Sequence, residues 1–321
     1  MLKDKIINIY KQNVFTRCDD TGSIYYFSHK DYKDLKFEDY EFLSSKGYVL
    51  KGKIYYYDNY KPNHLVVFDH GMGGGHLSYF KEIELLARNG FKVLSYDHSG
   101  CMESGGQSTG GFCQSLCDLN DLFNSLKASD KFKNYVFSVV GHSWGAFSTM
   151  NIPYFHKDIK HVVAMSGFIS LEQVLKQNFK GLLSSVYDEV YNIEKESNPG
   201  YVKVNAIDSL KSYEGKALII HSKDDKTVNY KFHFNVLKEE LKDNSNINFI
   251  LLNKKRHNPN YTEEAVNYKD KFFKIYIKQL KKGKLVTEEQ KEKFKNSFDW
   301  NKMTEQDLSV WEEIIKVLKD A

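Results

Sequence analysis

Short apolar runs alternate with helical patterns between about residue 64 and residue 280. The runs that predict buried strands are Leu65–Phe68, Phe91–Tyr96, Val136–Val140, His161–Met165, Ala217–His221 and Asn248–Leu252. The intervening patterns predict helices over Leu77–Arg88, Phe112–Lys127, Ala146–Asn151, Tyr230–Lys242 and Thr262–Leu280. Strands that are apolar on both faces and separated by helices indicate a mostly parallel sheet with helices on both sides. Ligands of such a sheet bind at the carboxyl ends of its strands.

Three segments depart from this alternation. Before residue 60, the aromatic and β-branched runs Ser23–Phe27 and Tyr48–Tyr57 predict strands. Between residues 168 and 210, apolar residues recur at three- and four-residue steps from Leu171 to Val190, which predicts a helical insertion over the sheet. We expect this insertion to act as a lid.

The third segment follows Gly283. Thr287 and Gln290 have the spacing of a helix-capping box. Further along, one predicted helix face consists of Leu308, Trp311, Ile315 and Leu318. We expect this helix to dock on the body of the protein, with a partner-binding helix as the alternative. The sequence thus divides into core residues 1–167, a lid at 168–210, core residues 211–282 and a helical extension at 283–321.

Composition excludes several classes of protein. The 46 basic and 42 acidic residues leave a net charge of only +4 in 321 residues, which does not predict nucleic-acid binding. No apolar stretch is long enough to span a membrane, and the start, Met1–Lys5, lacks the apolar stretch of a signal peptide. The four cysteines, at positions 18, 101, 113 and 117, have no zinc-site spacing. We therefore expect a reduced, cytoplasmic, globular protein without a metal.

A serine lies between two glycines at the end of a predicted strand. Gly141-His142-Ser143-Trp144-Gly145 follows the run Val136–Val140 and precedes a helical pattern. This strand–turn–helix setting is that of a nucleophile elbow, whose tight turn requires small neighbours and exposes the serine hydroxyl. Ser143 is the candidate nucleophile, and an ordinary turn serine is the alternative.

A serine hydroxyl needs a base to become a good nucleophile, and in this architecture the acid and then the base follow the serine in the chain. Two candidate acids, Asp224 and Asp225, come at the end of a predicted strand, and we assign the role to Asp225. Beyond them only two histidines remain. His233 lies inside a predicted helix, whereas His257 lies on a loop after the last strand. We therefore assign His257 as the general base.

Backbone N–H groups must hold the oxyanion that forms during acyl transfer. One donor is expected from Trp144, the residue after the nucleophile. The other is expected from the glycine-rich loop His70–Gly75, with Met72 as the first choice and Gly73 as the second. The same loop lacks the third glycine of a dinucleotide-binding motif, which disfavours nucleotide binding.

These blocks together resemble the α/β-hydrolase superfamily, specifically its single-domain serine hydrolases of the monoglyceride-lipase and serine-aminopeptidase types. The matching blocks are HG-x-G at 70–73, YDHSG at 96–100, GHSWGA at 141–146, and HSKDDKTV at 221–228 followed by RHN at 256–258. The resemblance covers roughly residues 45–280. It implies an eight-stranded, mostly parallel sheet, no metal or organic cofactor, and the oxyanion donors Met72 and Trp144. It also implies that Asp225, rather than Asp224, fills the acid position.

Several positions depart from the family pattern. Ser99 and Met102 replace the usual arginine and glycine of the loop at 96–106, and Arg256 replaces the glycine before the histidine. None of these changes removes a predicted catalytic group.

The function expected from these residues is hydrolysis of a carboxylic ester or thioester of a small to medium acyl group, a small-molecule substrate, through an acyl-enzyme. The closest alternative is an aminopeptidase or amidase, which would need lid carboxylates to hold a free amine; the candidates are Glu172, Asp188, Glu189, Glu194 and Glu196. A non-catalytic ligand-binding protein and an acyltransferase to another alcohol are further alternatives.

Other polar residues are expected to have structural roles. His70 and His142 are interpreted as hydrogen-bonding residues and Cys101, Cys113 and Cys117 as small buried ones. A lysine cluster is interpreted as a solvated helix face; its members are Lys269, Lys271, Lys274, Lys278, Lys281, Lys282 and Lys284.

Overall fold

The computed structural model describes residues 2–179 and 181–320, and within them eight strands form one sheet. The strands are β1 (Lys36–Leu43), β2 (Val49–Tyr56), β3 (His64–Asp69), β4 (Lys92–Tyr96), β5 (Val136–His142), β6 (His161–Met165), β7 (Lys216–Ser222) and β8 (Ile247–Leu252). Their order across the sheet is β1-β2-β4-β3-β5-β6-β7-β8. Only the pairings of β2 with β1 and β4 are antiparallel. The predicted mostly parallel sheet is therefore confirmed.

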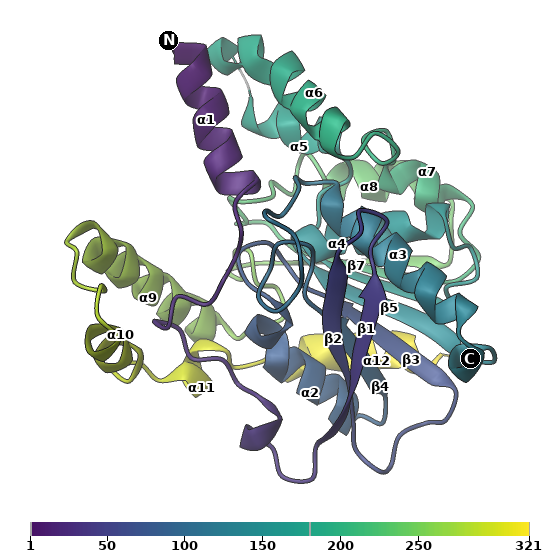
Figure 1. Cartoon of the computed structure of the whole chain (residues 1–321). Helices are drawn as coiled ribbons and strands as arrows, with labels where there is room; N and C mark the ends of the chain where they lie inside the picture. The colour runs from purple at the N-terminus through teal and green to yellow at the C-terminus, as the bar shows by residue number, and fades with distance from the viewer. Residues whose placement is uncertain (1, 180, 321) are drawn as a thin grey trace.

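Helices cover both faces of the sheet (Figure 1). They are α1 (Leu2–Val14), α2 (Phe80–Arg88), α3 (Gln114–Ala128), α4 (Trp144–Asn151), α5 (Leu171–Asn178), α6 (Tyr187–Ser197), α7 (Ala206–Lys211), α8 (Phe234–Glu240), α9 (Glu263–Lys281), α10 (Glu288–Lys295), α11 (Trp300–Met303) and α12 (Leu308–Lys319). The 3₁₀ turns are η1 (His29–Asp31), η2 (His76–Tyr79), η3 (Asp130–Phe132), η4 (Ile152–Tyr154) and η5 (Gly181–Val186).

Alternate residues of the central strands enter two apolar cores. In β3, Leu65 and Val67 pack with α3 and α4, whereas Val66 and Phe68 face α2 and α12. Since successive strand side chains point to opposite faces, a strand buried on both sides reads as a continuous apolar run. This is why the central strands were predictable.

Three segments near the N-terminus differ from the prediction or escaped it. Ser23–Phe27 was predicted to be a strand, and this is wrong: the segment is irregular. Its aromatic side chains pack instead of pairing in a ladder, with the Tyr25 ring 6.4 Å from the Trp300 ring. Helix α1 and strand β1 were not predicted. β1 is an edge strand with charged residues between its apolar ones, and α1 packs against the distant α6 and η5.

The segment between β6 and β7 contains α5, η5, α6 and α7. Helix α1 lies against it (Figure 1), and the Tyr10 hydroxyl donates to the buried Glu194 carboxylate of α6. The four predicted parts of the chain include residues 1, 180 and 321, which lie outside the described residues. The segment is helical as predicted, and its role as a lid stays a prediction.

The end of the chain docks on the sheet. Helix α12 buries Val310, Trp311, Ile314 and Leu318 beneath β6 and β7. The predicted face was correct for Trp311 and Leu318, but Leu308 is 65% exposed. Helices α9, α10 and α11 lie together at one side of the sheet (Figure 1). The predicted capping box of Thr287 and Gln290 opens α10.

Within the described residues, no helix is both long and apolar enough to cross a membrane. All four cysteines are free thiols.

Candidate active site

Ser143 occupies a strained turn between β5 and α4. Its φ of 57° and ψ of −113° lie outside the conformations that residues with a side chain prefer. The flanking glycines are required by close contacts. A Cβ on Gly145 would lie 2.1 Å from the Asp69 carbonyl oxygen, and one on Gly141 would lie 2.3 Å from Thr149 Oγ1. The Ser143 N–H donates to the Met165 carbonyl at 2.8 Å, which fastens the turn to β6.

The structure brings Ser143, His257 and Asp225 together. His257 Nε2 lies 2.7 Å from Ser143 Oγ, and His257 Nδ1 lies 2.8 Å from Asp225 Oδ2. The N–H groups of Thr227 and Val228 donate to the other Asp225 oxygen. Burial raises the pKa of Asp225, but hydrogen bonds from His221 and His257 outweigh it and hold that pKa well below its usual value. This arrangement holds a proton on Nδ1 and leaves Nε2 free to accept the serine proton.

The other two candidates of the sequence analysis have different positions. Asp224 Oδ1 accepts hydrogen bonds from Ser222 Oγ and from the Arg256 N–H, so this carboxylate fastens the loop that carries His257. His233 is the residue before α8 rather than a residue inside a helix. Its ring contacts the Ile169 N–H and Gln177 instead of Ser143.

The two predicted oxyanion donors border Ser143. Met72 and Trp144 line the same cavity as Ser143, and within the described residues neither backbone N–H has a hydrogen-bond partner. The glycine-rich loop passes beside the serine, since a Cβ on Gly71 would lie 3.4 Å from Ser143 Cβ. Gly73 lines the cavity as well, so the second choice for this donor stays open.

Residues 64–196 match the family model described as the alpha/beta hydrolase fold. This match and the strand order of the sheet give the chain the α/β-hydrolase fold. No protein with a curated description matches the sequence.

Solved structures of α/β-hydrolases share the fold at low sequence identity. An esterase from Pyrococcus furiosus is 21% identical, with a TM-score of 0.57 over 81% of this chain and 96% of its own. An acetyl xylan esterase from Paenibacillus is 13% identical, with a TM-score of 0.54 over 80% of this chain and 88% of its own. A protein from Bacteroides ovatus described as a putative dipeptidyl aminopeptidase IV is 17% identical, with a TM-score of 0.55 over 78% of this chain and 36% of its own. At these identities the similarity establishes the fold alone.

A cavity of about 600 Å³, here named the Ser143 cavity, opens above the hydrolase elbow. Phe112, Phe168 and Val174 form its apolar side towards the helical insertion. Its opposite side consists of Tyr79, Lys269, Asp270 and Phe273. Within the described residues, no group of three or more His, Cys, Asp and Glu side chains is placed to hold a metal ion.

The His142 side chain forms a hydrogen bond with the backbone of His257. His142 Nε2 donates to the His257 carbonyl at 2.5 Å, and the Tyr79 hydroxyl lies 2.9 Å from His142 Nδ1. Burial, and then the neighbouring His257, lowers the pKa of His142 well below its usual value. His142 is therefore a neutral hydrogen-bonding residue, as the sequence predicted.

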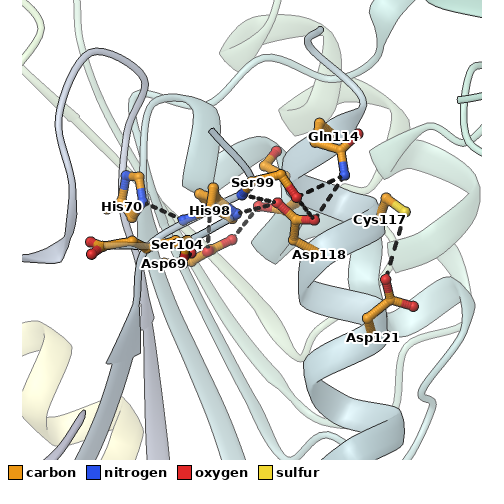
Figure 2. Close-up of polar contacts among 12 residues, drawn as sticks. Asp69, His70, His98, Ser99, Ser104, Gln114, Cys117, Asp118 and Asp121 are labelled. Carbon is orange, nitrogen blue, oxygen red and sulfur yellow. Dashed lines mark hydrogen bonds and ion pairs between the residues drawn. The ribbon is translucent and has the colours of Figure 1, made fainter. Parts of the chain in front are cut away.

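A buried charge network beneath the elbow was not predicted from the sequence (Figure 2). His98 follows β4 and lies between two carboxylates, with Nε2 2.9 Å from Asp69 Oδ1 and Nδ1 3.3 Å from Asp118 Oδ2. All three side chains are fully buried. Burial lowers the pKa of His98, but Asp69 and Asp118 outweigh it and raise that pKa to about 9. We therefore infer that His98 is an imidazolium at neutral pH.

This network borders the candidate oxyanion hole. The centroid of the His98 ring lies 4.7 Å from that of the Trp144 ring, and the His98 backbone N–H donates a hydrogen bond to His70 Nε2. Figure 2 shows how Ser99 and Gln114 complete the shell of donors around Asp118. The sequence signal was weak, because Asp118 shares its face of the predicted helix Phe112–Lys127 with the polar residues Gln114, Ser115 and Asp121. The pairing of Asp118 with His98 depends on the β4-β3-β5 order, which the apolar pattern does not determine.

Proposed function

We propose that this α/β-hydrolase is a serine hydrolase that cleaves carboxylic esters or thioesters of small to medium acyl groups. The observation that carries the proposal is the continuous hydrogen-bonded chain from Ser143 Oγ through His257 to Asp225 at the strained elbow. A nucleophile, a base and a carboxylate that orients the base are the three parts that acyl transfer requires.

In the proposed mechanism, His257 Nε2 takes the Ser143 proton while Oγ attacks the substrate carbonyl. The N–H groups of Met72 and Trp144 hold the oxyanion, and each such donor contributes about 3–4 kcal/mol of barrier reduction. The protonated His257 then gives its proton to the departing alcohol, which leaves an acyl-Ser143. Water attacks this ester with His257 as base again, which releases the acid and restores the hydroxyl.

An ester is favoured over an aminoacyl amide because of the side chains in the Ser143 cavity. None of the five lid carboxylates considered from the sequence lines that cavity within the described part of the chain. Two of them are occupied by cations, Glu172 by Lys176 and Glu189 by Lys3. Glu194 is buried beside Tyr10. Among the described residues, none of these five carboxylates is thus placed to bind a free amine in the Ser143 cavity.

Labelling and burst kinetics test the proposal. Wild-type protein and the Ser143→Ala variant are treated with a fluorophosphonate and with p-nitrophenyl acetate, butyrate and octanoate, alongside an aminoacyl p-nitroanilide. We expect labelling and an ester burst that both disappear in Ser143→Ala. Turnover of the anilide alone would support the amidase alternative, and neither labelling nor turnover would favour a ligand-binding protein.

A further inference from the structure

Lys269 differs from the other lysines of its helix. The sequence pattern predicted that all seven lysines from Lys269 to Lys284 form a solvated face, and for Lys269 this is wrong. The other six are exposed, whereas Lys269 is partly buried and lines the Ser143 cavity.

A second cavity lies beside the first, on the other side of Lys269. This aromatic cavity, of about 210 Å³, is bounded by Tyr25, Phe27, Phe272 and Trp300. Its walls come from the irregular segment after α1, from the glycine-rich loop with η2 and α2, and from α9 and α11. Lys81 and Glu82 are among the lining residues. The two cavities share five lining residues, which are Met72, Gly73, Tyr79, Lys269 and Phe273. The Lys269 side chain therefore lies where a pocket suited to an apolar group meets the pocket of the candidate nucleophile.

The Lys269 ammonium has no hydrogen-bond or ion-pair partner within residues 2–179 and 181–320. Its Nζ lies 4.8 Å from the centroid of the Tyr261 ring. The charge of Glu82 acts on Lys269 from beyond ion-pair distance, and Glu82 itself accepts a hydrogen bond from Asn260. The other nearby carboxylate, Asp270, is paired with Arg256.

An ammonium carries three donors, and leaving them unfilled away from water costs free energy. Burial lowers the pKa of Lys269 to about 8, so the group is still mostly protonated at neutral pH. Its charge is also felt at His142, the residue before Ser143, whose pKa it lowers. A cation thus lies close to the candidate nucleophile with no hydrogen-bond acceptor among the described residues.

We propose that Lys269 binds an anionic group, such as a carboxylate, on the substrate of the proposed hydrolase, whose apolar part occupies the aromatic cavity. This inference rests on the proposed function and specifies its substrate class. The anionic group can belong to the acyl part or to the leaving alcohol, and the assay below separates the two.

The test compares charged and neutral substrates of the same shape at neutral pH. On the acyl side, the mono-p-nitrophenyl ester of adipic acid is compared with p-nitrophenyl hexanoate. On the leaving-group side, para-butyryloxybenzoate is compared with its uncharged amide. The proteins are wild type, Lys269→Met, Lys269→Arg and the matched control Lys274→Met, which removes the same charge from an exposed position on α9.

We expect Lys269→Met to lower kcat/KM about tenfold or more for the anionic member of one pair, mainly through KM, because a charge-assisted hydrogen bond is lost. The neutral member should change little. Lys269→Arg should restore part of the preference, and Lys274→Met should behave as wild type. The pair that responds identifies the charged end of the substrate.

An equal loss for both members of each pair would assign Lys269 a structural role beside Glu82 and overturn the proposal, as would no change in either pair. If no ester is turned over at all, the proposed function fails first. The subsite is then tested alone, by calorimetric binding of the adipate ester to Ser143→Ala with and without Lys269→Met. Equal affinities in that comparison would overturn the subsite too.

Discussion

The Ser143 backbone is held in a conformation that its own side chain disfavours. A residue with a Cβ pays about 1–2 kcal/mol in the positive-φ region, whereas glycine does not. The turn is maintained by the hydrogen bond from the Ser143 N–H to the Met165 carbonyl and by the close approach of Gly145 to the Asp69 backbone. The strained turn therefore lowers local stability, and it also presents the Ser143 hydroxyl to the cavity.

We predict that the free energy of unfolding of Ser143→Gly is about 1 kcal/mol higher than that of Ser143→Ala. Both variants lose the hydrogen bond to His257, so their difference reports the cost of the backbone conformation less the extra backbone entropy that glycine loses on folding. Urea unfolding of the two variants measures it. Equal stabilities would show that the cost of the observed φ and ψ does not exceed the extra backbone entropy that glycine loses on folding.

Asp225 and Asp224 offer a second comparison between neighbours. In Asp225→Asn, the amide can donate to His257 and favour the tautomer with its proton on the wrong nitrogen. We expect kcat for an ester substrate to fall about 10⁴-fold. Asp224→Asn removes the same charge from the loop anchor at Ser222 and Arg256, and its loss should be far smaller. Similar losses in the two variants would contradict the assignment of Asp225.

Among the elements, periodicity predicted what is buried on regular faces. The central strands and α3 were predicted correctly because their apolar residues are buried in one of the two cores. Strand β1 escaped because its charged residues lie at an edge. Ser23–Phe27 misled because aromatic residues that suit a strand serve here to pack against α11.

The same limit applies to the candidate site. Ser143 and His257 could be assigned as candidates because motif spacing and chain order locate them, whatever the details of packing. The Asp69–His98–Asp118 network depends on which strands are neighbours. The exceptional setting of Lys269 depends on how α9 lies against the segment after α1. A local pattern carries neither kind of information.

Substitutions in helix α12 test which of its faces is buried against the sheet. Trp311 is 1% exposed beneath the sheet, whereas Leu308, from the predicted face, projects outward. We expect Trp311→Ala to lower the free energy of unfolding by about 3–5 kcal/mol and Leu308→Ala by less than about 0.5 kcal/mol. Chemical denaturation of both variants is the measurement. A large effect at Leu308 would contradict the observed docking.

At the scale of the whole molecule, the buried network makes stability depend on pH. His98 has a higher pKa in the folded protein, about 9, than the ordinary value of 6.5 that it regains on unfolding. The contribution of His98 to the free energy of unfolding is therefore complete below pH 6.5 and is lost as the pH rises through 9. The difference corresponds to about 3 kcal/mol.

We predict that the free energy of unfolding falls across that pH range in the wild type and falls less in His98→Gln. Denaturation at several pH values measures both slopes, and comparing them removes the contribution of other groups that titrate in the same range. Parallel slopes would refute a charged His98.

Segments from the first and the last third of the chain meet at the aromatic cavity. Helix α1 lies on α6, the segment around Tyr25 walls the aromatic cavity, and α9 and α11 close its other side. Most of these segments lie outside residues 64–196, which match the family model. Sequence changes in these segments would reshape the aromatic cavity and leave the central sheet and the turn at Ser143 in place. The matched region contains Ser143 but neither Asp225 nor His257, so similarity confined to it bears on the candidate nucleophile and not on the walls that these segments give the aromatic cavity.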